Sequence, residues 1–453
     1  MSTGPLLAFR LDRGHPLGLQ VEQQVRELIR TRALRVGESL PSTRSLAADL
    51  EVSRGVVVGA YAQLAAEGYI TLGRGAPPVV AASGRAAERV PELPVARFAR
   101  ATCLPDFGLF PRTDWLATTR ASLRRAAGQD FAYGEPLGAA HLRRELVPFL
   151  ARTRGVVGEP DRTCIFAGSS QALFVLGSIL RAKGVRRIGV EDPGHRWRTK
   201  TIAASGLEVV PVPVDDAGLR VDRIPDVPAV VVSPGHHFPL GVALSPERRR
   251  ALVEWAAEGD RLVVEHEYDA HFRYDRLSVA ALQSLAPEHV AYVGSASALL
   301  APTVRIGWAV LPARLVAPVV DRLFETSLST SRLTQLALAE FIARGYLDRH
   351  LRKSGAVYQR RRAALVAALA RHVPDVRVTG VAAGLFLSLA LPDSADEAAV
   401  LAESRARGVM LDGFDEHALA GHPPGLAFGF SGGPEAALRI RTPVFAEALA
   451  AAA

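Results

Sequence analysis

The hydrophobic pattern of the first eighty residues predicts a small unit of three helices followed by a hairpin. Apolar residues recur at helical spacing, and a serine that can cap a helix precedes the second and the third helix. Gly68 follows the third helix, where glycine readily adopts the left-handed conformation that ends a helix. We expect helices over residues 17–32, 42–50 and 53–67, with Ser42 and Ser53 as N-caps, and short strands over 69–72 and 79–80.

The rest of the chain alternates apolar runs with helical stretches. Several runs are apolar throughout, as expected of strands buried on both faces of a mostly parallel sheet. The expected strands cover residues 163–167, 187–191, 208–214, 229–233, 261–267, 290–294 and 305–311. Helices are expected over 170–182 and 245–258, with a long helical region over 332–372. A smaller α+β unit follows, with strands near 385–391, 409–412 and 426–430.

These patterns predict a multidomain fold. An N-terminal α+β winged helix-turn-helix precedes an α/β body, which has a mostly parallel central sheet and a small C-terminal α+β subdomain. Residues 81–104 mix alanine, glycine, proline and arginine without a clean period, which is typical of a linker. The expected boundaries are 7–80 for the winged unit, 81–104 for the linker, 105–345 for the large domain, and 346–453 for the helical connection and small subdomain.

Composition excludes wholesale disorder and a membrane span. Of the 453 residues, 49% are hydrophobic and 22% are charged, which is ample material for a buried core. No apolar run reaches the roughly 18 residues that a spanning helix needs. The N-terminus lacks the apolar stretch of a signal peptide, and Cys103 and Cys164 are too few for a disulfide framework. We therefore expect a cytoplasmic protein with no membrane partner.

The net charge of +8 arises almost entirely from arginine, because the chain has only three lysines, Lys183, Lys200 and Lys353. A basic chain can bind nucleic acid, although a GC-rich genome also favours arginine. The order helix, helix, tight turn, helix and wing suits the major groove of DNA, with the third helix in the groove. The expected DNA-binding residues are Ser42, Thr43, Arg44, Ser53, Arg54, Tyr61, Arg74 and Gly75.

The stretch LPSTRSLAADLEVSRGVVVGAYAQLAAEGYITLGRG resembles the winged-helix domain of GntR-type bacterial regulators. The resemblance implies operator DNA as a partner. The family usually has polar residues after the Ser-Arg pair and an arginine one turn later, whereas Gly55, Val56 and Gly59 stand here. We therefore expect altered or relaxed sequence readout, with the arginines bearing more of the contact. A helical dimerisation or protein-binding module of the same fold is the alternative.

The body resembles the fold-type I aminotransferase domain that the MocR subfamily of GntR-type regulators fuses to such a winged helix. The matching segments, in family order, include YGEPLGAAHLRREL, AGSSQALFVL, VEDPGHRWRTK, SPGHHFPLGVALSPERR, VVEHEYDAHFRY and GSASALLAPTVRIGWAVLP. The resemblance implies a homodimer with a domain-swapped, head-to-tail arrangement, and a pocket at the subunit interface that serves pyridoxal phosphate. An enzyme with this cofactor needs a lysine amine, a carboxylate at the pyridine nitrogen and a phosphate cradle.

At the positions that match the family, the covalent and electronic groups are replaced. Ala298 stands at the Schiff-base lysine, and His266 stands at the carboxylate that faces the pyridine nitrogen. His195 occupies the place of the ring that stacks on the cofactor, and Ala427 aligns with an arginine that often receives the substrate carboxylate. Lys200 lies five residues after His195, and we expect it on the surface rather than in the pocket.

The anion-binding half of the pocket is retained. Arg305 stands at the family's phosphate arginine, and Tyr268 at the position that faces the ring hydroxyl. Helix capping by the serines and a structural ion pair for Arg305 are the alternative interpretations. The expected residues of the effector or vestigial cofactor pocket are Ser169, Ser170, His195, His236, His266, Tyr268, Ser295, Ser297, Ala298 and Arg305.

Histidines gather in the pocket segments, at His195, His236, His237, His266 and His271. Imidazoles are common metal ligands, but His266 and His271 are five residues apart and face opposite sides of a straight strand. We therefore expect no metal, and contact with an anionic or aromatic effector is the stronger hypothesis.

The sequence thus predicts a DNA-binding transcription regulator. Its aminotransferase-like domain is expected to be catalytically inactive, to dimerise and to sense a small-molecule effector that the sequence does not identify. No covalent cofactor is expected. The alternatives are a regulator that still binds pyridoxal phosphate non-covalently, a constitutive DNA binder whose body only dimerises, and an aminotransferase, against which Ala298 speaks.

Overall fold

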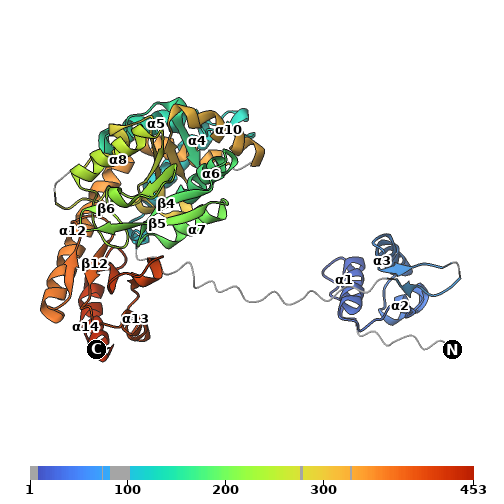
Figure 1. The fold of residues 1–453 in the computed structure, drawn as a ribbon. Helices are drawn as coiled ribbons and strands as arrows, with labels where there is room; N and C mark the ends of the chain where they lie inside the picture. The colour runs from blue at the N-terminus through green and yellow to red at the C-terminus, as the bar shows by residue number, and fades with distance from the viewer. Residues whose placement is uncertain (1–8, 74, 82–102, 276–278, 327–328, 453) are drawn as a thin grey trace. The chain divides into compact units, whose positions relative to one another are not determined.

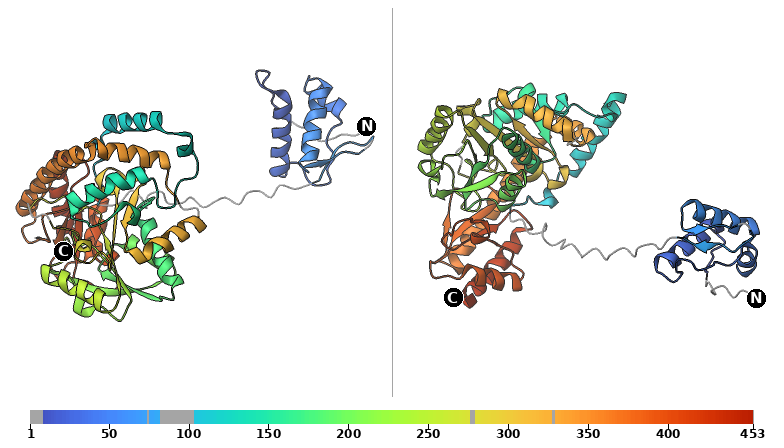
Figure 2. Two further views of the ribbon diagram at one scale, coloured as in Figure 1. Left: turned by 90° about the horizontal axis from the view of Figure 1, so that it is seen from above. Right: turned by 45° about the vertical axis from the view of Figure 1, so that its right-hand side comes forward.

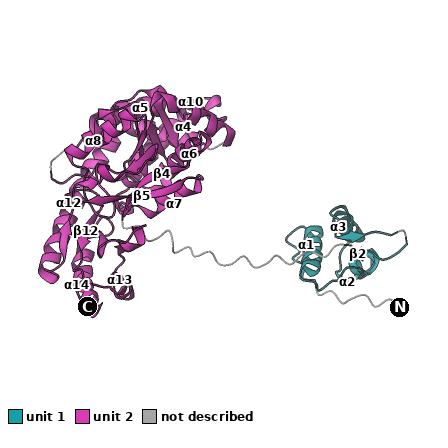
Figure 3. Cartoon of the chain, in the orientation of Figure 1, with its two compact units in different colours: residues 1–95 teal, residues 96–453 magenta. Residues whose placement is uncertain are grey.

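The computed structural model describes residues 9–73, 75–81, 103–275, 279–326 and 329–452. The chain divides into two compact units, Met1–Val95 and Ala96–Ala453 (Figure 3). The division falls inside the segment expected to be a linker, and each unit has a hydrophobic core of its own.

The described residues of the smaller unit form three helices and a two-stranded hairpin (Figure 1). Ser42 Oγ accepts a hydrogen bond of 3.1 Å from Ser45 N, as an N-cap does. Ser53 holds the N-cap position of the third helix without a side-chain hydrogen bond, and Gly68 follows that helix with a φ of 80°. The elements are α1 Leu17–Arg30, α2 Thr43–Asp49, α3 Arg54–Ala66, β1 Ile70–Thr71 and β2 Val79–Val80, which confirms the expected order.

A mostly parallel sheet lies at the centre of the larger unit, as the apolar runs predicted. Its described strands are hydrogen-bonded in the order β3-β10-β9-β8-β7-β4-β5-β6. The strands from β9 to β5 in this order run parallel, whereas β10 is antiparallel to both neighbours and β6 is antiparallel to β5. The bounds are β3 Thr163–Phe166, β4 Arg187–Asp192, β5 Glu208–Asp215, β6 Gly218–Leu219, β7 Ala229–Val232, β8 Leu262–His266, β9 Val290–Ser295 and β10 Gly307–Val310.

Helices cover both faces of this sheet (Figure 1). Val231 packs in one cluster with residues of α6 and α10, while Val230 packs in another with residues of α8. Each such valine contributes about 1.5–3 kcal/mol by leaving water, which explains why these runs are apolar throughout. The helices are α4 Arg112–Arg125, α5 Ala140–Arg154, α6 Ser169–Ala182, α7 Arg196–Ala204, α8 Pro246–Glu258, α9 Ala296–Leu299, α10 Ala313–Thr326 and α11 Arg332–Ala343.

A smaller lobe completes the larger unit, coloured orange to red at the lower end of the body in the right-hand view of Figure 2. Its described strands form an antiparallel sheet in the order β11-β12-β14-β13. None of the helices in the described ranges combines the length and the apolar character needed to cross a bilayer. The elements are α12 Tyr346–His372, β11 Arg377–Thr379, β12 Phe386–Ala390, α13 Glu397–Ala406, β13 Asp412–Gly413, β14 Gly425–Gly429 and α14 Glu435–Ala452.

The long helical region expected over 332–372 is present as two helices, α11 and α12, with Gly345 between them at a φ of 69°. Two expected strands were wrong in detail. The strand expected from Arg305 begins at Gly307, since Arg305 itself has a left-handed φ of 53°. The strand expected over 409–412 begins only at Asp412. The pattern also missed β6 and β11, which are only two and three residues long.

Candidate functional site

The start of α3 presents side chains that were expected to meet DNA. Ser53 and Arg54 are exposed there, and Arg54 Nε donates a hydrogen bond of 3.4 Å to Thr43 Oγ1 at the start of α2. Ser42 and Arg44 are exposed beside Thr43. Hydroxyls and guanidinium groups from the starts of α2 and α3 therefore lie on one surface, and such groups bind DNA phosphates.

The remaining residues of the expected DNA-binding set are Tyr61, Arg74 and Gly75. Tyr61 is only 1% exposed, and its hydroxyl donates a hydrogen bond of 3.1 Å to the Pro41 carbonyl. Burial raises the pKa of this hydroxyl well above its ordinary value. The assignment of Tyr61 to DNA contact was therefore wrong: its side chain fills the core and fixes α3 against the start of α2. Gly75 is exposed, whereas Arg74 lies outside the described residues.

The outer face of α3 offers few groups that could read bases. Gly55 and Gly59 are exposed, and between them Val58 is 45% exposed. None of these side chains donates or accepts a hydrogen bond, whereas base edges in the major groove are read mainly by bidentate polar side chains. Arg54 is therefore the best-placed base-reading group in the first turn of α3.

A second site lies at the carboxyl ends of the parallel strands β4, β7, β8 and β9. His195 follows β4, His236 follows β7, His266 ends β8 and Ala298 lies on α9 directly after β9. Ligands of open α/β sheets bind at this edge. The Tyr268 ring lies in the middle of the group, with ring centroids 6.1, 6.2 and 6.5 Å from those of His266, His236 and His195.

Burial favours the uncharged forms of three histidines here, His195, His237 and His266. Burial lowers the pKa of His195 to about 3 and that of His237 to about 4, and it holds the pKa of His266 well below its ordinary value. The neighbouring charge of Arg198 acts in the same direction on His195 and His266. The His266 side chain, whose residue is 7% exposed, has no hydrogen-bond partner among the described residues.

The His271 ring stacks on Phe149 of α5 at a centroid distance of 6.1 Å. Within the described parts of the chain, Tyr268 has ring contacts with His195, His236 and His266 but none with His271. In the described residues no group of three or more histidines, cysteines and carboxylates is arranged to hold a metal ion.

Buried ion pairs line the floor of the pocket, and sequence reasoning missed them. Arg198 Nη2 donates to Glu191 Oε2 at 2.9 Å, and both residues are at most 4% exposed. Asp269 Oδ1 lies 2.8 Å from His236 Nδ1. The pairing partners are separated by 7 and 33 residues. A usable signal was an acidic residue at or shortly after the end of a buried strand, since Glu191 lies within β4 and Asp269 follows β8 by three residues, and a buried carboxylate requires a partner.

A loop of the small lobe closes over His195. Asp192 accepts hydrogen bonds from Leu419 N at 2.6 Å and from Ala420 N at 2.9 Å, and Gly194 N donates to the His417 carbonyl at 2.9 Å. The His417 ring lies 6.4 Å from the His195 ring.

The side of the pocket toward the small lobe is apolar. Phe238, Phe386 and Ala427 form one buried cluster, with Cys103 and Tyr268 packed against it. Ala427, at the expected place of a carboxylate-binding arginine, is fully buried. The pocket therefore offers hydrocarbon and aromatic surface there instead of a charge.

The N-terminus of α6 and Arg305 lie close together, where the sequence predicted an anion-binding site. Gly168 precedes α6 with a φ of 137°, and a Cβ added there would lie 3.9 Å from Arg305 Nη1. Arg305 is exposed, and no ion pair to it is found in the described part of the chain. Ser169 begins α6, and the side chains of Ser295 and Ser297 flank the turn from β9 to α9.

All three lysines are surface residues. Ala298 is 6% exposed within the core, whereas Lys183, Lys200 and Lys353 are all exposed. Lys200 Nζ lies 5.6 Å from the centre of the exposed Trp197 ring. The expectation that Lys200 is a surface residue is confirmed.

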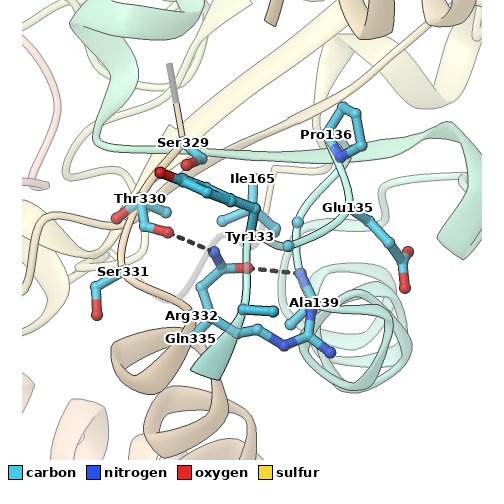
Figure 4. A pocket seen from close by; sticks show the side chains of 13 residues that line it. Tyr133, Glu135, Pro136, Ala139, Ile165, Ser329, Thr330, Ser331, Arg332 and Gln335 are labelled. Atoms are coloured by element: carbon cyan, nitrogen blue, oxygen red, sulfur yellow. Dashed lines mark hydrogen bonds between the residues drawn. The ribbon is translucent and has the colours of Figure 1, made fainter. Parts of the chain in front are cut away.

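A separate hollow of about 220 Å³ lies between the loop after α4 and the start of α11 (Figure 4). Gln335 bridges its walls: its side-chain oxygen accepts from Ala139 N at 2.7 Å, and its Nε2 donates to the Thr330 carbonyl at 3.0 Å. Tyr133 lines it and is fully exposed in the single chain. No pattern in the sequence indicated this hollow.

Comparisons with known proteins match both units. The model of gntR-family bacterial regulatory proteins matches residues 17–80, and that of class I and II aminotransferases matches residues 107–447. The chain is 31% identical to the HTH-type pyridoxine biosynthesis transcriptional regulator PdxR of Corynebacterium glutamicum, over 93% of each chain. The chain belongs to the MocR subfamily of GntR-type regulators.

Further relatives agree with this membership of the MocR subfamily. The probable rhizopine catabolism regulatory protein MocR of Rhizobium meliloti is 28% identical, over 82% of this chain and 80% of that protein. An archaeal alanine:glyoxylate aminotransferase superposes with a TM-score of 0.72 at 24% identity, covering 78% of this chain and 90% of that one, which shows the fold of the body. The relatives with both units are named as transcriptional regulators.

Aminotransferase-like domains of MocR-type regulators normally bind pyridoxal phosphate, and the pocket fits that group only in part. The α6 N-terminus with Arg305 suits a phosphate. The rest does not fit: Ala298 supplies no amine, and the buried His266 supplies no negative charge for a protonated pyridine. The residues therefore suit the phosphate and not the reacting parts of the cofactor.

Proposed function

We propose that this MocR-type protein is a transcription regulator that binds operator DNA through its winged helix and uses its aminotransferase-like body without catalysis. The observation that carries the proposal is the buried Ala298 at the end of β9, together with three lysines that are all exposed. Pyridoxal phosphate chemistry begins with an amine in the pocket, and this chain offers none there.

The body has the features of a sensing domain. Its pocket joins strand ends of the large domain to the loop of the small lobe that carries His417, so an occupant would contact both lobes. A ligand that favours one arrangement of the lobes changes the population of that arrangement. We infer that this shift alters the affinity of the winged helix for its operator.

We further infer a homodimer. Leu116 on α4 is 68% exposed, Phe131 is 64% exposed, and Tyr133 is fully exposed. Large apolar side chains left exposed on a soluble protein are candidates for an interface. A second copy of the chain would cover them, and the family resemblance supports a head-to-tail, domain-swapped arrangement.

A second candidate is favoured by the anion cradle. The α6 N-terminus and the exposed guanidinium of Arg305 beside it suit the phosphate of pyridoxal phosphate held without a covalent bond. With pyridoxal phosphate bound in this way, the protein would still be a regulator, and pyridoxal phosphate would be its effector.

Reductive labelling separates these proposals from an enzyme. The full-length protein is incubated with pyridoxal phosphate, reduced with borohydride and digested for peptide mass spectrometry. We expect no labelled pocket peptide, while an Ala298→Lys variant serves as a positive control for the chemistry. A stoichiometric adduct on Lys200 in the unmodified chain would overturn the proposal. Retention of unreduced pyridoxal phosphate in native mass spectrometry would identify the non-covalent form.

A further inference from the structure

Buried polar atoms without a partner gather around Tyr268. Among the described residues, the Tyr268 hydroxyl, both ring nitrogens of His266 and Nδ1 of His195 have no hydrogen-bond partner, and neither do Arg198 Nε and His417 Nε2. Leaving one such atom unpaired costs about 1–3 kcal/mol, so native proteins rarely leave several together. This cluster therefore points to a bound group that is not part of the chain.

The acidic side chains of the pocket floor are already engaged. The Glu191 carboxylate pairs with Arg198 and accepts from Ser233 N at 2.9 Å. Asp269 pairs with His236 and accepts from Leu385 N at 3.0 Å.

The next carboxylates along the strand ends are engaged in the same way. Glu267 accepts from Arg154 Nη2 at 2.7 Å and from Ala270 N at 2.8 Å. Asp192 holds two backbone N–H groups of the small-lobe loop. A positively charged ligand would therefore find no carboxylate free to neutralise it in this floor.

The unpartnered groups suit an uncharged ring. A neutral imidazole offers one N–H donor and one acceptor nitrogen, and a phenol offers both as well. Flat aromatic surfaces stand beside them, because the rings of Phe238 and Phe386 pack against each other at a centroid distance of 5.1 Å and His195 lies 5.3 Å from Phe238. The charge of Arg198, which lowers the pKa of His266, would also repel a positively charged ring.

We propose that this pocket binds a phosphate monoester of a flat, uncharged ring, and that His266 selects against a positively charged ring. The phosphate would lie at the α6 N-terminus beside Arg305. The inference rests on the proposed function, because it treats the pocket as a sensing site. It goes further by naming the ligand class and the residue that discriminates within it.

Two isosteric probes test the role of charge. The compound 3-methylbenzyl phosphate and its cationic counterpart, 1-methylpyridinium-3-ylmethyl phosphate, have the same shape and differ by one positive charge in the ring. Titration calorimetry on the full-length protein gives both dissociation constants. We expect the neutral probe to bind about tenfold or more tightly than the cation.

Variants at one position separate charge from shape. His266→Asp introduces a carboxylate and should reverse the preference in favour of the cation. His266→Asn has nearly the same size without the charge and should keep the preference for the neutral probe. Arg305→Gln should weaken both probes by a similar factor, which would place them in this pocket. Thermal melting of each variant checks that it folds, and His266→Asn remains informative if the aspartate variant does not.

Equal affinities in the unmodified chain, or a preference for the cation, would overturn the inference. So would the failure of both probes to bind at millimolar concentration, which would mean that ordered water alone satisfies the unpartnered atoms. In either case the proposed function stands if borohydride still labels no pocket lysine. A labelled pocket lysine would instead remove the proposed function itself.

Discussion

His236 Nδ1 lies 2.8 Å from one carboxylate oxygen of Asp269, whose other oxygen accepts a hydrogen bond from Leu385 N. The histidine and the aspartate follow β7 and β8 of the large domain, while Leu385 directly precedes β12 of the small lobe. Burial raises the pKa of Asp269 above its ordinary value, and the charge and hydrogen bond of His236 act against that rise. The pair therefore joins the two lobes at the edge of the pocket.

The close packing around the His236–Asp269 pair predicts that one added methyl group lowers the stability of the fold strongly. Gly384 has a φ of 69°, and a Cβ there would lie 2.2 Å from His236 Nδ1 and 2.4 Å from Asp269 Oδ2. We expect Gly384→Ala to lower the free energy of unfolding by about 2–5 kcal/mol, because backbone strain adds to overpacking. Gly421→Ala, where no atom lies within 4 Å, is the matched control. If the urea unfolding curves of the two variants coincide, the contacts assigned to position 384 are wrong.

The exposed guanidinium at the start of α3 predicts the DNA-binding phenotype. Arg54→Ala should weaken specific operator binding by about 1–3 kcal/mol, since few other side chains of this face can read a base. Arg30→Ala is the control, because Arg30 is occupied by Glu27 on α1. Footprinting with a salt series is the measurement, and affinity should fall as salt rises. If Arg54→Ala weakens binding to operator DNA and to unrelated DNA equally, Arg54 contacts phosphates and not bases.

Restoring the amine alone should not restore catalysis. Ala298→Lys supplies an amine, but the buried and neutral His266 still cannot hold a proton on a pyridine nitrogen by charge. Loss of one well-placed ionic partner costs on the order of 10² in rate. We therefore expect the double variant with His266→Asp to exceed the single variants by more than the product of their effects. Half-transamination followed by absorbance is the assay, and equal rates for Ala298→Lys and the double variant would disprove the role assigned to position 266.

Acid should destabilise the body through its buried histidines. His195, His237 and His417 have folded pKa values of about 3, 4 and 4, below the ordinary 6.5, because burial disfavours their charged forms. The unfolded chain therefore binds more protons between pH 6.5 and 4, and stability falls as the pH drops through this window. Burial also raises the pKa of Glu265, to about 7, and that of Asp269, and these two carboxyl groups act in the opposite direction. The histidines outnumber them, since burial also lowers the pKa of His266, His271 and His350.

Tryptophan fluorescence isolates this effect in the body, since all four tryptophans, Trp115, Trp197, Trp255 and Trp308, lie in the larger unit. His266→Gln should flatten the dependence of the urea midpoint on pH. His372→Gln, at an exposed position of α12, should leave it unchanged. A midpoint that rises on acidification would contradict the assigned protonation states.

The segment that follows the expected linker is held by a buried ion pair. Asp106 Oδ2 accepts from Arg361 Nη2 at 2.8 Å, and Arg361, which is 7% exposed, also donates to the Ser431 carbonyl. Asp106→Asn would leave a buried guanidinium without its counter-charge, which should cost about 2–4 kcal/mol of unfolding free energy. The exposed Asp393→Asn is the control in a thermal or urea melt. A change below about 0.5 kcal/mol, typical of surface positions, would show that this pair does not hold the segment.

The sequence predicted those elements whose pattern is set by burial. The run Ala-Val-Val-Val of β7 is buried on both faces, so its apolar character alone identified the strand. Strand predictions failed where buried apolar residues do not form the hydrogen bonds of a sheet. Val409 and Leu411 are buried, yet they belong to no strand. The glycine itself was the only sign in the sequence of the break between α11 and α12 at Gly345, because helical periodicity continues on both sides of it.

For the pocket, the sequence predicted the residues that match positions of the family motif. It predicted few of the residues that pack around them. Ala298 and His266 were found because a known motif has other residues there. Cys103, Phe386 and His417 come from distant parts of the chain and meet only through the fold. Tyr61 was misassigned for the same reason, since periodicity alone does not show which face of α3 is buried.

The two hydrogen bonds from the small-lobe loop to Asp192 have a kinetic consequence. Leu419 N and Ala420 N belong to one loop and donate to one carboxylate on β4, so separating the lobes breaks both bonds in a single event. We therefore expect the closed and open arrangements of the lobes to be two distinct states, and not a continuous range of distances between the lobes. Ligand entry past His195 would wait for that event, and its observed rate would level off at high ligand concentration at the opening rate of the lobes.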